Sequence, residues 1–372
     1  MPTEALRLKD VEDTASRFAA RHIEPVASEL DHADPVFPEL AFSQGLEAGF
    51  DRFVLPESAG GYGFSTIELG ALITALARTC AGHAAVFGVH AAIINSIHEA
   101  GSENKNQLLE TIFTSRRPVA TVIPDPLSPT EFETDVLAEP REPGRFSIDG
   151  CAGLAINVAL AGYCVAFAKD RQGQPSAFLV KDGDAGVIIG PPEFALGLRA
   201  MPMAEVKFSD FPAPAAQVIA VGDQAMNFYR GLLANLSLII AAAAGGIMQA
   251  ARKKAMQYAN ERYQGGVMII DHPHLRNILG AMAAAETAMD GAILKASTRA
   301  PDFPVALGTK IVTTEATVRL CTDAVQILGG YGYMRDFGLE KRMRDAAVLA
   351  LLPISNPRAE LLLAAIEKEK LA

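Results

Sequence analysis

The chain has 372 residues, of which 50% are hydrophobic and 20% are charged, and its net charge at pH 7 is −10. This length exceeds what one hydrophobic core usually serves, so two or three domains are expected. A chain this acidic is a poor partner for nucleic acid, and its charged first residues lack the apolar core of a secretory signal.

Cysteine usage and hydropathy indicate a soluble chain from a reducing compartment. Four cysteines, Cys80, Cys151, Cys164 and Cys321, form no CxxC pair and no metal-site spacing. We therefore expect buried thiols, no metal and a cytoplasmic location. The longest apolar run, residues 236–251, is rich in alanine and glycine and short for a membrane span. This run is interpreted as a buried helix, and no transmembrane segment is expected.

Residues 1–117 are predicted to form an N-terminal helical domain. Residues 6–30 have a helical period with charges on one face. After the loop LPESAGGYGF, Ser65 and Glu68 form a capping-box pattern before an apolar run. Two further helical runs, 81–100 and 103–115, complete this part.

Residues 118–217 are predicted to form a β domain. Prolines and glycines separate short β-type runs such as PVATVI, RFSIDG, YCVAFA, SAFLV and GVIIG. In the run AEVKFSDF, Ala204, Val206 and Phe208 alternate with polar residues, which is the period of a half-buried strand. Many short strands with turn signals favour a small sandwich or barrel.

Residues 218–372 return to a helical period and are predicted to form a C-terminal four-helix bundle. The expected helices cover residues 224–263, 272–298, 305–328 and 355–370. The predicted fold class is therefore α+β and multidomain, in the order helical domain, β-barrel or sandwich, helical bundle.

Two segments of the last part carry candidate binding residues. QILGGYGYMRD places Gly329, Gly330 and Gly332 directly after a helical run that contains Gln326. One glycine is explained as a helix stop, but three leave open whether another group approaches the backbone. In YANERYQGG, Arg262 follows a long helix, and its guanidinium suits phosphate oxygens. The alternative for this arginine is a solvated cation at a helix end.

Other common site patterns are weak or missing. His83 and His90, and likewise His272 and His274, have no third ligand that would indicate a metal site. The segment GGYG does not follow a strand, so the dinucleotide-binding fingerprint is excluded by its context.

Five stretches together resemble one family along nearly the whole chain: LPESAGGYGFS, RFSIDGCAGLAINVALAGYCVAFA, GLRAMPMAEVKFSDFPAP, YANERYQGG, and QILGGYGYMRD with RMRDA. They resemble the signature segments of acyl-CoA dehydrogenases, which are flavoproteins with this helical, β, helical order. The resemblance implies FAD as the cofactor, bound in part by a neighbouring subunit. It assigns seven residues of this chain to FAD: Arg262 at the pyrophosphate, Gln264, Thr130, and the turn of Gln326, Gly329, Gly330 and Gly332 at the adenosine end.

The departures from the family pattern fall on catalysis and on the chain's own flavin site. The family's catalytic glutamate falls at Pro353, and the alternative position of that base falls at Leu236. Neither side chain accepts a proton, so no catalytic residue is assigned.

The flavin loop of the family corresponds to residues 124–131. Four of its positions are conservative matches: Asp125, Pro126, Thr130 and Glu131. Six flavin-site positions of the family carry different residues in this chain. Pro124, Leu127 and Pro129 lie in this loop, and Leu154 and Ile156 lie further along the β domain. Gly265 lies in the loop that the family contributes to the neighbouring subunit's site.

The resemblance therefore implies the base-lacking subunit of a heteromeric, FAD-dependent acyl-CoA dehydrogenase that desaturates a CoA thioester. Its partners would be a homologous subunit, in a heterotetramer or homo-oligomer, and an electron-transfer flavoprotein. Two alternatives stay open. One is a homomeric flavoenzyme that acts on a CoA thioester with a relocated base or by a different reaction. The other is a non-catalytic structural relative.

Overall fold

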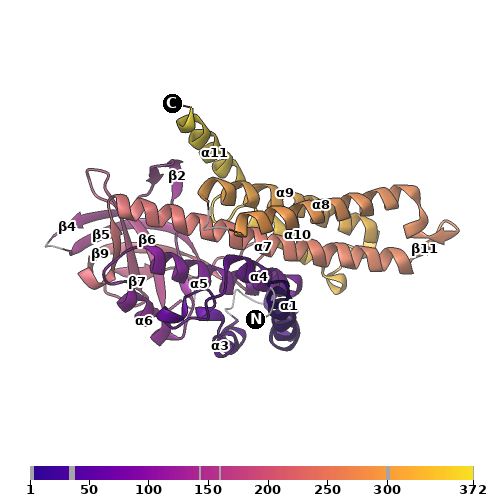
Figure 1. Cartoon of the computed structure of the whole chain (residues 1–372), viewed down its shortest axis with the longest axis horizontal. Helices are drawn as coiled ribbons and strands as arrows, with labels where there is room; N and C mark the ends of the chain where they lie inside the picture. The colour runs from indigo at the N-terminus through magenta and orange to yellow at the C-terminus, as the bar shows by residue number, and fades with distance from the viewer. Residues whose placement is uncertain (1–3, 33–37, 142–143, 159–160, 299–301, 372) are drawn as a thin grey trace.

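The computed structural model describes residues 4–32, 38–141, 144–158, 161–298 and 302–371. The N-terminal helices and a β-sheet lie side by side, and long C-terminal helices run past both (Figure 1). The distal ends of these long helices extend beyond the rest of the fold, and we call this extension the arm. The predicted order of helical domain, β domain and helical domain is confirmed.

The N-terminal part is built on two buried helices, α4 (Thr66–Thr79) and α5 (Ala81–Glu99). The capping box predicted for α4 is present: Ser65 N–H donates to Glu68 Oε2 at 2.7 Å, and the Ser65 hydroxyl accepts from the Glu68 N–H. The other helices are α1 (Glu4–Phe18), a π-helical turn (Ala19–Ile23), α2 (Glu24–His32), α3 (Glu39–Glu47) and α6 (Lys105–Ser115).

The sheet follows the order β10-β7-β6-β1-β5-β9-β8. Strands β1 and β4 each pair with both β5 and β6. Strand β1 pairs with the end of β5, and β4 pairs with the first residues of β5. The sheet is therefore partly closed, as expected for a small barrel. Its strands are β1 (Val119–Thr121), β4 (Leu137–Pro140), β5 (Phe146–Ile156), β6 (Tyr163–Lys169), β7 (Pro175–Lys181), β8 (Val187–Ile189), β9 (Met203–Ala213) and β10 (Val218–Val221).

A separate hairpin, β2 (Asp125–Ser128) with β3 (Glu131–Glu133), precedes this sheet's β4. The sequence did not predict β2, β3, β4 or β10. Each has only three or four residues, which is too few for a period of two to be recognised.

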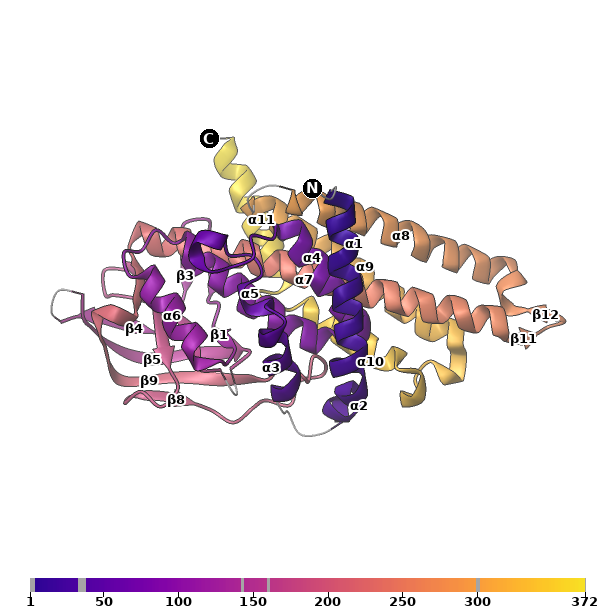
Figure 2. The ribbon, with the colours of Figure 1, turned by 60° about the horizontal axis from the view of Figure 1, so that its bottom comes forward.

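The C-terminal helices are α7 (Asp223–Glu261), α8 (Pro273–Ser297), α9 (Phe303–Leu328), α10 (Leu339–Leu349) and α11 (Asn356–Lys370). A short hairpin of β11 (Tyr263–Gln264) and β12 (Val267–Met268) joins α7 to α8 at the end of the arm, away from the sheet (Figures 1 and 2). Among the described helices only α7 is long and apolar enough to cross a membrane. However, 94% of its most apolar window is buried, as in the core helix of a globular fold.

Helix α10 was missed by the sequence prediction because it is short and charged, and tertiary ion pairs hold it. Arg344 of α10 donates to Asp31 of α2, with Nη2 and Oδ2 2.6 Å apart, and to the Leu196 carbonyl at 2.9 Å. Asp345 accepts the Leu198 N–H at 2.7 Å. Helix α10 thus connects the N-terminal helices to the segment that leads into β9.

The electrostatics of this connection are set by Asp31, which is 2% exposed. Burial disfavours its charged form, but the hydrogen bond from Arg344 and the charges of Lys341, Arg344 and Arg199 outweigh burial and lower the pKa of Asp31. Asp31, His32 and Glu340 also place three potential metal-ligand atoms within 4.8 Å of one another. Since Arg344 already binds both carboxylates, the arrangement is interpreted as an ion-pair network.

Arg344→Ala is expected to lower the free energy of unfolding by about 3–5 kcal/mol, because a buried carboxylate would lose its main partner. Urea unfolding followed by circular dichroism measures the change. The control is Lys370→Ala, which breaks an exposed pair with Glu367 and should cost no more than about 1 kcal/mol. Equal, small losses in both variants would contradict the role given to Arg344.

The sign of the pH dependence gives a second readout of the same prediction. Asp31 has a lowered pKa in the folded state, so its contribution is complete above the ordinary carboxyl pKa of about 4. It is lost as the pH falls through the folded value. The difference between wild type and Arg344→Ala should therefore narrow as the pH is lowered below about 4.

Candidate functional site

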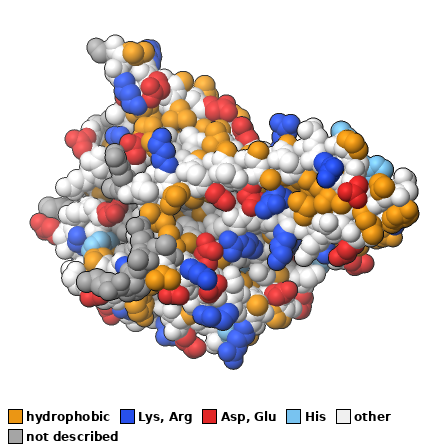
Figure 3. Space-filling model, turned by 45° about the vertical axis from the view of Figure 1, so that its right-hand side comes forward, with side chains coloured by type: hydrophobic (Ala, Val, Ile, Leu, Met, Phe, Trp, Pro, Cys, Tyr) orange, Lys and Arg blue, Asp and Glu red, His pale blue; other side chains and the backbone are white. Residues whose placement is uncertain are grey.

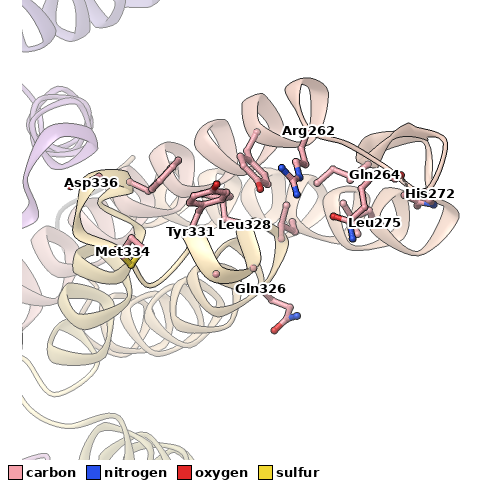
Figure 4. Close-up of a pocket in the computed structure, with 16 residues that line it drawn as sticks. Arg262, Gln264, His272, Leu275, Gln326, Leu328, Tyr331, Met334 and Asp336 are labelled. Carbon is pink, nitrogen blue, oxygen red and sulfur yellow. Dashed lines mark hydrogen bonds between the residues drawn. The ribbon is translucent and has the colours of Figure 1, made fainter.

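A cavity of about 730 Å³ lies on the arm, between the end of α7, the β11–β12 hairpin and the turn after α9 (Figure 4). Five residues predicted to bind the cofactor line this one cavity: Arg262, Gln264, Gln326, Gly329 and Gly330. They come from segments that are more than 60 residues apart in the sequence. The fold therefore brings the two candidate motifs together.

The position of Arg262 follows from how α7 ends. Arg262 is the C-cap residue, and its N–H still donates to the Tyr258 carbonyl at 2.9 Å. Its own carbonyl accepts from the Ile269 N–H at 2.8 Å, which closes the hairpin. The turn of the hairpin contains Gly265 with φ +68°. The His272 ring nitrogen Nε2 lies 2.9 Å from the Gln264 carbonyl oxygen and fixes the hairpin against the start of α8.

The guanidinium of Arg262 makes no hydrogen bond or ion pair with the described residues, and the side chain is exposed. All its N–H donors are therefore available to a ligand, and an anion with several oxygens matches them best. Asp336 also lines the cavity, but it lies at the far end of the labelled row from His272 (Figure 4). The positive charge thus dominates at the hairpin end of the cavity.

Aromatic side chains that the sequence analysis missed form one wall of the cavity. The ring centroid of Tyr331 lies 6.2 Å from that of Tyr258 and 5.1 Å from that of Phe337. The spacing of Tyr258 and Arg262, four residues apart on one helix, was the available signal, because such pairs share a helix face. His272 had no comparable signal, since its role depends on the return of the hairpin.

The three glycines after α9 have different structural reasons, and Gly332, unlike Gly329 and Gly330, does not line the cavity. A Cβ on Gly332 would lie 2.2 Å from the Val325 carbonyl oxygen, so this glycine is required by the chain itself. Gly329 has φ +57° and ψ −130°, which only glycine adopts readily. A Cβ on Gly330 would meet only the Tyr333 hydroxyl, at 3.9 Å, so the space beside it is open.

Thr130, the remaining predicted cofactor residue, does not line the arm cavity. It lies exposed in the turn between β2 and β3, and its N–H donates to the Ser128 hydroxyl at 3.2 Å. The same segment starts at Pro124, whose carbonyl accepts from the buried Tyr229 hydroxyl of α7 at 2.9 Å. Asp125 pairs with Arg358 of α11 at 3.5 Å. Thr130 and the arm cavity therefore belong to separate parts of the fold.

The hydrogen-bonding capacity of the segment 124–131 is low. Pro124, Pro126 and Pro129 have no N–H, and the N–H of Thr130 is already used within the turn. On the neighbouring sheet, Leu154 is 49% exposed and Ile156 is buried. Both side chains are aliphatic, so neither offers a polar group. A polar ligand would find few donors here.

The two segments considered for a catalytic base carry no carboxylate. Leu236 is fully buried in α7, and Pro353 lies in the loop between α10 and α11, whose residues 350–356 include no Asp or Glu. Fully buried Lys310 of α9 holds this loop by donating to the Ala350 carbonyl at 3.0 Å, the Ile354 carbonyl at 2.7 Å and Asn356 Oδ1 at 2.6 Å. Burial lowers the pKa of Lys310 to about 7, and the charge of Glu315 opposes this shift.

Two family models match the chain. "Acyl-CoA dehydrogenase, N-terminal domain" matches residues 7–114, and "Acyl-CoA dehydrogenase, C-terminal domain" matches residues 226–352. The chain is 28% identical over 358 residues to cyclohex-1-ene-1-carbonyl-CoA dehydrogenase of Geobacter metallireducens, covering 92% of this chain and 93% of that one. It is 25% identical over 367 residues to benzylmalonyl-CoA dehydrogenase of Aromatoleum aromaticum, covering 96% of both.

A solved structure, butyryl-CoA dehydrogenase from Megasphaera elsdenii, superimposes with a TM-score of 0.90 at 22% identity. The superposition covers 99% of both chains. This likeness establishes the same fold over the whole chain.

Lys310→Met is expected to lower the free energy of unfolding by about 2 kcal/mol or more, because three buried oxygen acceptors would lose their donor. Hydrogen exchange of the Asn356 N–H, which donates to the Ala350 carbonyl, should accelerate in the same variant. Lys253→Met, on the α7 surface, is the control. Unchanged exchange at Asn356 would show that the loop does not depend on Lys310.

Proposed function

Because the chain belongs to the acyl-CoA dehydrogenase family, we propose that it is a subunit of an FAD-dependent acyl-CoA dehydrogenase. Its arm completes the FAD site of a homologous partner subunit, while its own flavin site and proton-accepting position are not functional. In the desaturation of a CoA thioester, bound FAD supplies the acceptor for the hydride that leaves the β-carbon. The proposal for this chain rests on its own residues.

The residues of the arm cavity fit part of an FAD molecule. Arg262 has an unpaired guanidinium suited to the pyrophosphate. Gly329 and Gly330 leave open space where side chains would stand. Gln264 and Gln326 line the same cavity and can bind sugar or base atoms through their amides.

One observation carries the assignment to a partner's FAD, and it concerns α7. Tyr229, which binds the carbonyl of Pro124, and Arg262 lie 33 residues apart on this helix. At 1.5 Å per residue they are separated by about 50 Å, which is farther than one FAD molecule extends. Arg262 and the segment 124–131 therefore cannot contact the same FAD molecule.

The chain's own flavin segment fits the cofactor poorly. The flavin ring presents hydrogen-bonding atoms along one edge, but segment 124–131 has lost two N–H donors to Pro124 and Pro129, and the carbonyl of Pro124 is used by Tyr229. We therefore assign no catalytic step to FAD in this chain's own site.

Proton removal from the substrate is affected as well. Desaturation requires a base at the α-carbon of the thioester, and a positioned base contributes roughly 10²- to 10⁴-fold. Neither residues 350–356 nor residues 229–240 of α7 contain a carboxylate. The isolated chain is thus expected to have little acyl-CoA dehydrogenase activity, while a partner with an intact base would carry the reaction.

A homomeric flavoenzyme acting on a CoA thioester is the second candidate. The exposure of Leu154 favours it, because this side chain leaves one face of β5 open rather than packed. FAD that co-purifies with the chain expressed alone would support this candidate over the first.

Arg262→Ala should lower the FAD content of the complex formed with a co-expressed homologous subunit. The lost contact is a charge-assisted hydrogen bond to phosphate, worth about 1.5–3 kcal/mol, or roughly a 10- to 100-fold loss of affinity. Flavin absorbance per protomer, measured at limiting FAD, gives the result. Gly330→Val should act in the same direction by filling the open space of the cavity. Gly332 is unsuitable for this purpose, because any side chain there would disrupt the turn itself.

Arg276→Ala is the matched control, since Arg276 is an exposed arginine of the arm that does not line the cavity. It should leave the FAD content unchanged. Full FAD content in Arg262→Ala would show that this arginine serves solubility or structure and would refute the assignment to a partner's cofactor.

Pro353→Glu alone should restore little activity, because the ring contacts of the chain's own flavin segment would still be missing. Dye reduction with a panel of acyl-CoA thioesters, on the isolated chain and on the complex, measures the outcome. Turnover approaching about 1 s⁻¹ or more in the isolated variant, the ordinary range of enzymes, would mean that its flavin site is sound. The homomeric candidate would then replace the first.

A further inference from the structure

A second cavity, of about 340 Å³, lies within the body of the fold and is separate from the arm. It lies among α4, α5, α7 and the end of α8, and it opens to solvent, since Ser65, Glu99 and Thr298 of its lining are exposed. About half of its wall is apolar, with Phe64, Leu69 and Ile239 among the contributors. The remaining wall is polar, and several of its groups have no hydrogen-bond partner among the described residues.

The orientation of Asn235, a residue of α7 that is only 7% exposed, is fixed by its neighbour Ser96. The Ser96 hydroxyl donates its proton to the Ala92 carbonyl at 2.8 Å, so it can only accept from Asn235. Accordingly, Asn235 Nδ2 donates to Ser96 Oγ at 2.9 Å. The Oδ1 of Asn235 has no partner among the described residues and remains an acceptor in the cavity wall.

The same reasoning applies to Asn95, which lines the cavity beside Glu99. Asn95 Nδ2 donates to Glu99 Oε1 at 3.2 Å, since a carboxylate can only accept. This leaves Asn95 Oδ1 and the second oxygen of Glu99 as acceptors. Ser297, at the end of α8, is 6% exposed, and its hydroxyl has no partner in the described part of the chain. The unused oxygens of Asn95 and Glu99 are acceptors, while the Ser297 hydroxyl and the second N–H of each amide can also donate.

The charge of the cavity has one sign. Glu99 is the one charged residue in the described lining, which includes no Lys, Arg or His. Glu99 is exposed to solvent. Desolvation by the neighbouring protein still raises its pKa, the hydrogen bond from Asn95 opposes this shift, and no cation contributes. The N-terminus of α4 adjoins the cavity but is already capped by Glu68, which Arg7 binds at 3.0 Å. An anionic ligand would find no cation here.

We propose that this cavity binds a small ligand with an apolar body and a primary ammonium head. The ammonium has three donors and no acceptor, which matches the unpaired oxygens of Asn235 and Asn95 and the carboxylate of Glu99. The apolar body fits the wall formed by Phe64, Leu69 and Ile239. This site is independent of the proposed FAD contacts, because Arg262 and the glycine turn lie on the arm.

Gly70 of α4 offers a direct way to close the cavity. It lines the cavity, and a Cβ placed on it would meet only the Ser297 hydroxyl, at 3.9 Å. Gly70→Leu should therefore fill the space without a backbone clash, and leucine is a better helix former than glycine. Gly280→Leu is the matched control, since Gly280 is an exposed helical glycine of α8 with no atom near its Cβ position.

Isothermal titration calorimetry of the full chain with benzylammonium, benzyl alcohol and benzoate tests the proposal. The three probes share a ring and differ in the charge of the head group. Benzylammonium should bind at least about tenfold more tightly than benzoate, because a charged hydrogen bond is gained in one and an unpaired anion is buried in the other. Gly70→Leu should abolish binding, and Gly280→Leu should retain it.

Glu99→Gln supplies an independent test if Gly70→Leu does not fold. It should weaken benzylammonium by about tenfold and leave benzyl alcohol unchanged. The proposal is overturned if the wild-type chain binds none of the probes, if benzoate binds as well as benzylammonium, or if Gly70→Leu binds like wild type. None of these results depends on FAD or on a partner subunit, so they are distinct from a failure of the proposed function.

Discussion

The rest of the structure depends on two contacts made by α10. Arg344 binds Asp31 of α2, and Asp345 binds the Leu198 N–H before β9. A Cβ on Gly197 would lie 2.6 Å from the Arg344 carbonyl, so the two segments approach as closely as their backbones permit. In the sequence, helix α10 also connects the glycine turn of the arm to the loop 350–356. Buried ion pairs of this kind carry a desolvation cost. In return, these contacts fix α2, α10 and the segment before β9 relative to one another.

Helix α7 extends this fixed relation to the arm. Its first half lies in the core beside the sheet and the N-terminal helices, where Tyr229, Asn235 and Leu236 are buried. Its last turns leave the body and end at Arg262, next to an exposed apolar hairpin that includes Tyr263, Val267 and Met268 (Figure 3). A rigid helix cannot bring its two ends to one ligand, so the polar groups at each end belong to different sites. The exposed apolar side chains around the arm cavity are consistent with a surface covered by another subunit.

Much of this arrangement could be predicted from the sequence, and the exceptions have physical causes. The capping box of α4 and the long bundle helices are encoded locally, by Ser65 with Glu68 and by apolar periods. Helix α10 was missed because it is held by contacts with distant residues rather than by its own composition, and the strands β2 to β4 were missed because they are too short to show a period of two. The glycines after α9 could be identified from the sequence, but the reason for each glycine could not. The close approach of the Val325 carbonyl, which requires Gly332, is recognisable only in three dimensions. The cavity around Asn235 was not foreseen for the same reason: its four helices meet only in the folded chain.

The loop 350–356 keeps its shape through polar contacts that do not use the side chain at the position considered for a catalytic base. Its shape is set from outside by the ammonium of Lys310, which binds the carbonyls of Ala350 and Ile354 and the side chain of Asn356. Asn356 in turn donates to Thr314 at 3.1 Å, so the polar network closes on α9. None of these bonds involves the side chain of residue 353. Lys310 and Asn356 are needed for this arrangement, because each leaves buried polar atoms unpaired when it is removed. The polar contacts that shape this loop thus come from α9 and from Asn356, and none of them requires a group that transfers a proton.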